Sequence, residues 1–162
     1  MKNSEINNSD TFKKFHLLII GSKMAKYSAI FLVFLSLFLM FYSEKNMLII
    51  VTLLIGVAVL GIYIFKFLPL SNINQKPNSQ GSLSSSILKF KTYMSNRKKF
   101  EILFISIWAL SLIPFLSSYF DSGIKAIIAA ILFIVPTAVF GMLAFIKAEK
   151  EVQTLESQIQ IK

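Results

Sequence analysis

Long apolar runs without a charged residue alternate with polar and basic stretches along this chain. Four such runs cover residues 27–43, 47–65, 102–120 and 126–146. A helix rises about 1.5 Å per residue, so runs of this length can cross a hydrocarbon core of roughly 30 Å, the shortest only when nearly upright. The pattern therefore predicts an all-α integral membrane protein with four transmembrane helices.

Short polar connections join these runs in pairs, at residues 44–46 and 121–125. Connections of this length join helices that run antiparallel and side by side. We therefore expect two antiparallel hairpins that form a four-helix bundle. The hairpins share a layout of basic segment, apolar run, tight turn and second apolar run, which leaves open a parallel repeat of one unit.

Apolar residues at helical spacing precede each hairpin among basic residues. The first such stretch, residues 11–20, predicts a short amphipathic helix that Asp10 caps and Gly21 ends. The second, residues 87–99, predicts a basic helix capped within residues 84–86. We expect both helices to lie on the cytoplasmic membrane surface.

The connection between the hairpins is rich in Ser, Asn, Gln, Gly and Pro over residues 71–86, which predicts a flexible linker. Pro114 should kink the third span, and Pro136 frees a backbone carbonyl in the fourth that Thr137 could bond.

The predicted organisation is an N-terminal tail with a basic amphipathic segment (1–26), a first hairpin (27–69), a linker with a basic helix (70–100), a second hairpin (101–147) and a tail helix (148–162).

The placement of positive charge predicts the orientation. Residues 1–26 hold five Lys or Arg, the stretch from 66 to 101 holds seven, and three follow residue 146, against one in each tight turn. Basic residues near span ends stay in the cytoplasm, so both termini should lie there, in a membrane that we take to be the bacterial inner membrane. The net charge of +9 is then explained by topology, and we expect no nucleic-acid partner.

The basic segments are also candidates for an interaction surface. Each Lys or Arg near an anionic membrane contributes about 1 kcal/mol of attraction, although topology alone would explain the same residues, and we leave both explanations open. The candidates that face lipid or a partner are Lys13, Lys14, Lys89, Lys91, Arg97, Lys98 and Lys99.

Small residues inside the spans mark candidate contacts between helices. Gly56 and Gly61 lie in the second span, and Ala130, Ala138 and Gly141 belong to a row of small residues in the fourth. Small residues let helix backbones approach closely in a membrane. The row predicts packing within this chain or, alternatively, a contact between copies in an oligomer.

The tail carries Ala148, Val152, Leu155 and Ile159 at four-three-four spacing. This spacing is typical of a short coiled coil, so association of the tail with a partner or a second copy is one interpretation, although two heptads make a weak signal. The alternative, which we favour, is a solvated helix with its glutamates Glu149, Glu151 and Glu156 on a water-exposed face.

Groups able to do chemistry are sparse. The four apolar runs contain no Asp, Glu, Lys, Arg or His, the chain has no Cys, and its one histidine, His16, is no metal site. Ionisable groups within spans mark proton relays and ion sites, so their absence argues against a proton-coupled carrier or a charge-lined pore. We predict no catalytic residue, cofactor or metal.

The expected function is a non-enzymatic anchor, regulator or complex subunit that presents a basic cytoplasmic surface to lipids or to a protein. The alternative is an oligomeric pore.

Overall fold

The protein is all-helical. A computed structural model describes residues 2–43 and 46–160, and no strand occurs among them. Four helical stretches are long and apolar enough to cross a membrane, which confirms the predicted class. The predicted turn at residues 44–46 falls largely on residues 44 and 45, outside the described residues. The helices are α1 (Lys2–Tyr42), α2 (Met47–Lys66), α3 (Gln80–Ser111), α4 (Ile113–Phe120) and α5 (Gly123–Gln160).

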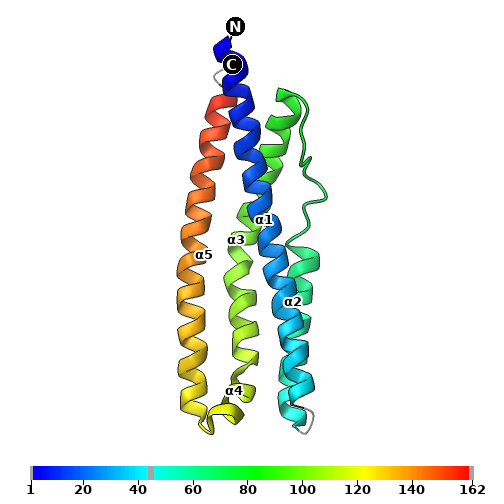
Figure 1. The fold of residues 1–162 in the computed structure, drawn as a ribbon, viewed down its shortest axis with the longest axis vertical. Helices are drawn as coiled ribbons and strands as arrows, with labels where there is room; N and C mark the ends of the chain where they lie inside the picture. The colour runs from blue at the N-terminus through cyan, green and yellow to red at the C-terminus, as the bar shows by residue number, and fades with distance from the viewer. Residues whose placement is uncertain (1, 44–45, 161–162) are drawn as a thin grey trace.

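The helices form one elongated bundle (Figure 1). α1 runs the length of the molecule and α2 returns antiparallel to it, but only part of the way. Residues 67–79 then climb beside the bundle to the start of α3, which descends to α4, and α5 runs back to the end where both termini lie. One end of the bundle is therefore built from α1, α3 and α5 without α2.

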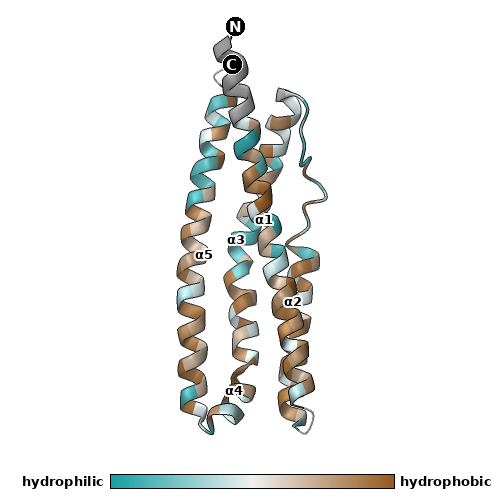
Figure 2. Ribbon diagram, viewed as in Figure 1, coloured by the Kyte–Doolittle hydropathy of each residue, from teal (hydrophilic) through white to brown (hydrophobic). Residues whose placement is uncertain are grey.

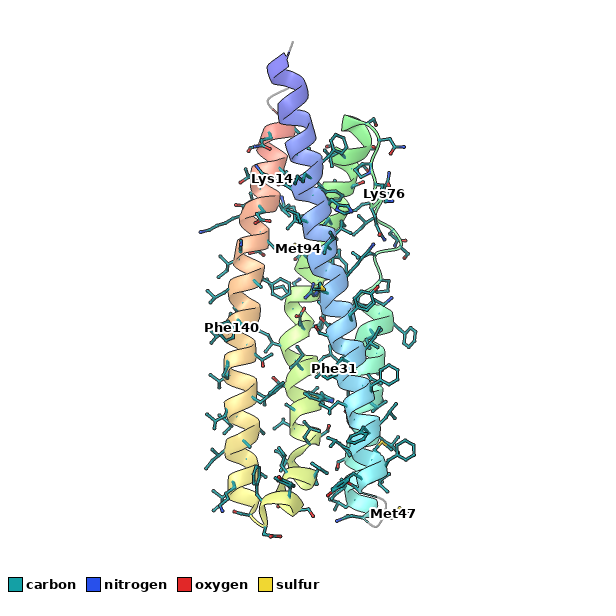
Figure 3. The ribbon with its side chains drawn as sticks, viewed as in Figure 1. Lys14, Phe31, Met47, Lys76, Met94 and Phe140 are labelled. Carbon is teal, nitrogen blue, oxygen red and sulfur yellow. The ribbon has the colours of Figure 1, made fainter. Side chains whose placement is uncertain are left out.

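Polar and apolar residues separate along the long axis (Figure 2). We call residues 11–26, 69–100 and 145–159 the polar bundle, and the other described residues from 27 to 144 the apolar part. In the apolar part most large side chains point outward, as Phe31 of α1 and Phe140 of α5 do (Figure 3). That outward apolar surface is typical of helices that face lipid.

We predicted that the two amphipathic segments would be separate helices, but each is part of a longer helix. α1 passes through Gly21 without ending, and the basic segment of α3 continues directly into the third apolar run. A glycine inside a helix costs about 1 kcal/mol relative to alanine. Burial of Phe15, Leu18 and Ile19 in the polar bundle outweighs this cost, so the helix continues.

α3 begins earlier than the sequence indicated. Its N-cap is Ser79, whose Oγ accepts a hydrogen bond from the backbone N–H of Ser82 at 3.3 Å, while the Ser82 Oγ accepts one from the Ser79 N–H at 3.1 Å. Residues 84–86, our predicted caps, lie inside the helix, where the Ser86 hydroxyl bonds the Ser82 carbonyl at 2.7 Å. The reciprocal capping box decides the start.

The linker is attached to the bundle, contrary to our expectation. Leu70 and Ile73 are buried in the core of the polar bundle, and residues 80–86 are helical. These apolar side chains hold the segment because they are buried in a core that α1, α3 and α5 also form.

The two prolines act differently. Pro114 stands in the first turn of α4, and the third apolar run breaks between Ser111 and Ile113, as a proline kink requires. α5 continues past Pro136. The Thr137 hydroxyl donates to the carbonyl of Phe133 at 2.7 Å, not to that of Leu132, which Pro136 leaves without its helical donor.

Candidate functional site

A charged cluster marks the boundary between the two parts. Arg97 and Glu101, one turn apart on α3, form a two-pronged ion pair in which Nη2 lies 3.0 Å from Oε1 and Nε bonds Oε2. Only 11% and 14% of the two side chains are exposed. The Tyr63 hydroxyl of α2 donates to Glu101 at 2.8 Å, and the guanidinium lies 5.1 Å from the ring centre of Phe145 on α5. The cluster thus joins α2, α3 and α5 where the apolar runs end.

Two ion pairs tie α3 to α5 within the polar bundle. Lys91 Nζ lies 2.8 Å from Glu156, and Lys98 Nζ lies 2.9 Å from Glu149. We predicted a solvated face for both glutamates, whereas each has a lysine partner. The sequence held a signal for this, since lysines and glutamates are each seven residues apart and pair in the order that antiparallel helices require.

These pairs reduce the set of basic residues available to a partner. Of the seven candidates, Lys91, Arg97 and Lys98 are occupied within the chain, and Lys14 is half-buried. Lys13, Lys89 and Lys99 are exposed, and no ion pair involves them in the part of the chain that the structure describes.

A groove runs between α1 and α5 across the boundary. It consists of two cavities, of about 470 Å³ in the apolar part and about 390 Å³ in the polar bundle, that share Glu101, Gly141, Ala144 and Phe145 as lining. α3 forms the floor, together with Tyr63 of α2. Volumes between about 300 and 1,000 Å³ are usual for ligand sites. We call this the boundary groove.

The small residues of α5 divide between packing and this groove. Ala126 and Ala130 are buried, while Ala138 and Gly141 line the groove. A Cβ at Gly141 would meet no atom within 4 Å, so no other described helix of this chain packs closely against this position. The alternative, a contact between copies, stays a prediction.

The glycines of α2 differ from each other in the same way. A Cβ at Gly56 would lie 2.2 Å from the Ser111 Oγ and 3.2 Å from Trp108, so α2 and α3 approach closely there. A Cβ at Gly61 would meet nothing within 4 Å. α2 and α3 therefore approach closely at Gly56, whereas no other described helix of the chain approaches closely at Gly61.

The apolar side chains of the tail, Ala148, Val152, Leu155 and Ile159, are covered by other parts of the same chain. Val152 and Leu155 are buried in the polar-bundle core with residues of α1 and α3, and Ile159 packs against the same cluster. The alternative of a solvated, unpartnered helix does not fit this packing. No second copy is needed to cover these side chains, so association through the tail would require another surface.

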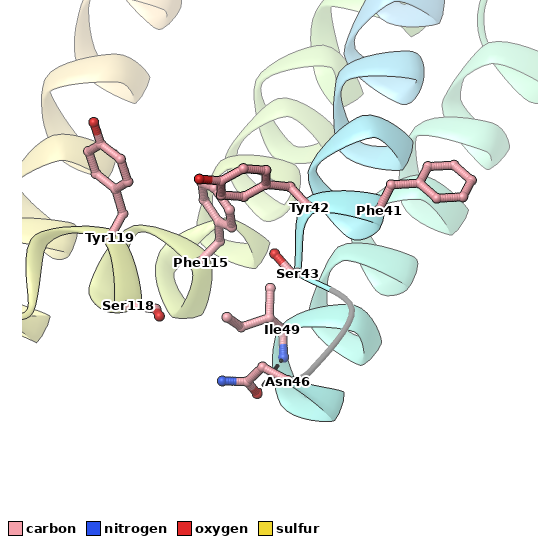
Figure 4. Close-up of a pocket in the computed structure, with 8 residues that line it drawn as sticks. All are labelled: Phe41, Tyr42, Ser43, Asn46, Ile49, Phe115, Ser118 and Tyr119. Carbon is pink, nitrogen blue, oxygen red and sulfur yellow. Dashed lines mark hydrogen bonds between the residues drawn. The ribbon is translucent and has the colours of Figure 1, made fainter.

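A further pocket, of about 480 Å³, lies at the opposite end, between the α1–α2 connection and α4 (Figure 4). Among the described residues, its lining is aromatic, aliphatic, hydroxyl and amide. Asn46 is already used, since its Oδ1 accepts from the N–H groups of Leu48 and Ile49 as the N-cap of α2. Phe41 points away from the other side chains in this view, so the rings do not form a cage.

The chain matches no protein-family model, and no similar curated protein or solved structure was found. Among the described residues, no group of three or more His, Cys, Asp or Glu could hold a metal ion.

Proposed function

We propose that this chain is a non-enzymatic, multi-pass protein of the bacterial inner membrane, which acts as an anchor, regulator or complex subunit. Its four apolar stretches form two membrane hairpins, and its polar bundle stands in the cytoplasm. There it presents a basic surface to an acidic protein partner.

The segregation of charge along the bundle carries this proposal. Of the 17 lysines and arginines, only Lys45, outside the described residues, and Lys125 fall in the tight turns of the sequence. The turn between α4 and α5 lies at the end of the bundle opposite the termini (Figure 1). Both termini and the connection from α2 to α3 lie toward the other end (Figure 1). Retention of basic segments in the cytoplasm then orients the whole bundle.

Distance favours a protein partner over the membrane surface. Lys13 and Lys89 lie 13 and 12 residues from Lys26 and Glu101, where the apolar runs begin. Along a continuous helix this is about 18 to 20 Å from the edge of the hydrocarbon core and about 10 to 15 Å from the headgroup layer, which exceeds the Debye length of about 8 Å at physiological salt. An anionic bilayer attracts such distant lysines only weakly, whereas a cytoplasmic protein can reach them.

The polar bundle is also suited to be a rigid platform. One continuous core holds α1, α3 and α5 together, and the ion pairs of Lys91 and Lys98 fix α3 against α5. Lys13 on α1 and Lys89 on α3 are then displayed at fixed positions, which reduces the ordering cost of binding.

Orientation is tested with single cysteines in this cysteine-free chain, at Asn78→Cys and Ser122→Cys. A membrane-impermeant maleimide should label position 122 in intact spheroplasts and position 78 only after permeabilisation. The reverse pattern would overturn the proposal.

The partner surface is tested by reversing charge at Lys13 and Lys89 together. The Lys13→Glu/Lys89→Glu variant should lose its co-purifying partner from cross-linked membranes, while Lys125→Glu, at the opposite end, should keep it. Equal recovery from both variants would reject this surface.

Liposome flux tests the pore alternative. The purified protein should leave liposomes sealed to small ions. Leakage that rises with protein density would instead favour an oligomeric pore.

A further inference from the structure

The boundary groove is separate from the proposed partner surface, because neither Lys13 nor Lys89 lines it. It is lined by residues of both α1 and α5, and it crosses the level where the apolar runs end. A ligand that fills it must be apolar at one end and polar at the other.

The apolar end of the groove fits an acyl chain. Its walls come from Ala29 and Leu32 of α1, Ile105 of α3, and Phe133 and Ala138 of α5. The empty space beside Gly141 lets a chain pass from this cavity into the next, since no side chain there closes the way.

The polar end carries charges of both signs. Arg97 and Glu101 neutralise each other as an ion pair in the floor. Lys147 and Glu151, one turn apart on α5, line the same cavity, and no ion pair of the described residues involves either. A purely anionic headgroup would meet the unpaired carboxylate of Glu151, and a purely cationic one would meet the ammonium of Lys147. Only a headgroup with both charges can pair with both.

We propose that the boundary groove binds one phosphatidylethanolamine molecule from the surrounding bilayer. Its phosphate pairs with Lys147, its ammonium pairs with Glu151, and one acyl chain lies in the apolar cavity between α1 and α5. This inference rests on the spanning helices and not on the proposed partner.

The first test fills the groove. Gly141→Leu should be accommodated without a clash, and Gly61→Leu is its matched control, since it is also a glycine of a spanning helix with open space at its Cβ but lies outside the groove. The protein is equilibrated with equal amounts of phosphatidylethanolamine and phosphatidylglycerol, and retained lipid is counted by native mass spectrometry. Wild type and Gly61→Leu should retain one phosphatidylethanolamine, and Gly141→Leu should lose it. Retention by Gly141→Leu would overturn the site.

The second test addresses the headgroup. It does not require a spanning helix to accommodate a larger side chain. Glu151→Gln removes one ion pair to the lipid, and it should lower the preference for phosphatidylethanolamine over phosphatidylglycerol by about tenfold, the effect of one charge-assisted hydrogen bond. An unchanged preference would overturn the headgroup assignment. A doubled protein mass without retained lipid would show that a second copy covers the groove instead.

The Lys13→Glu/Lys89→Glu variant should retain the lipid like wild type. The proposed lipid site and the proposed partner surface can therefore be rejected independently of each other.

Discussion

The polar bundle and the apolar part are built from the same helices but hold together differently. The polar bundle has one cluster of twelve buried hydrophobic side chains drawn from α1, α3, α5 and the linker. The apolar part has two clusters, of four and three buried residues, and most of its large side chains point outward. Water drives apolar side chains together, whereas lipid tails are as apolar as leucine and give them no reason to bury.

Specific contacts take the place of a core in the apolar part. The indole N–H of Trp108 donates to the Ser36 hydroxyl at 2.8 Å, which joins α3 to α1. Gly56 lets α2 approach α3 at Ser111. The apolar part is therefore held by a few well-placed polar and small residues, and the polar bundle by one larger apolar core.

The largest expected effect on stability is a difference between two phenylalanines, one in each part of the molecule. Phe90 is buried in the polar bundle with its ring edge-on to Phe15, and Phe140 is 70% exposed in the apolar part. Phe90→Ala should destabilise the protein by about 3 to 5 kcal/mol, while Phe140→Ala should change stability by at most about 0.5 kcal/mol. Denaturant unfolding in a mild detergent measures both. Equal effects would remove the distinction between the two parts.

The second prediction compares two glycines of α2. Gly56→Leu should destabilise by about 1 to 3 kcal/mol, because even its Cβ would overlap Ser111 and contact Trp108. Gly61→Leu should leave thermal stability nearly unchanged, since its Cβ meets open space. A common shift for both variants would show that close approach of α2 and α3 does not matter.

A smaller effect is expected for one hydroxyl. Ser36→Ala leaves the buried indole N–H of Trp108 without its acceptor and should cost about 0.6 to 1.7 kcal/mol, from the average to the maximum found for hydrogen bonds between membrane helices. Ser28→Ala is the control, because both hydroxyls bond the carbonyl four residues back but Ser28 is exposed and has no second partner in the described structure. The emission of Trp108, the only tryptophan, reports the loss directly.

The smallest effect is expected for the ion pairs of the polar bundle. The coupling energy of Lys98 and Glu149, measured by a double-mutant cycle with Gln at each position, should be about 0.2 to 1 kcal/mol and should fall as salt rises. Both side chains are about two-fifths exposed, which weakens their attraction. A salt-independent coupling above this range would contradict the expectation that Lys98 and Glu149 interact as a solvent-exposed pair.

Local signals were sufficient for part of the fold. The apolar runs predicted the four long helices, and Pro114 predicted the break between α3 and α4, because both depend on neighbours in sequence. The start of α3 could have been found from Ser79 and Ser82, whose reciprocal bonds need only a three-residue spacing.

The candidate site was less predictable. The sequence shows Glu101 as the charge next to the third apolar run, but its partners Tyr63 and Arg97 lie on two helices, and only Arg97 is close to it in sequence. The row of small residues in α5 predicted packing, yet nothing in the row itself distinguishes buried Ala130 from Gly141 in the groove. That distinction depends on where α1 lies relative to α5.

The sequence by itself determined the helical class, the number of apolar stretches and the concentration of positive charge in three segments, because hydropathy and charge are properties of a segment. The tertiary structure alone decided that the basic segments extend the long helices as one bundle, that Lys91 and Lys98 are paired with α5, and that a groove opens beside Gly141. These features depend on the distances between helices, and a distance between two helices is set by every side chain that separates them.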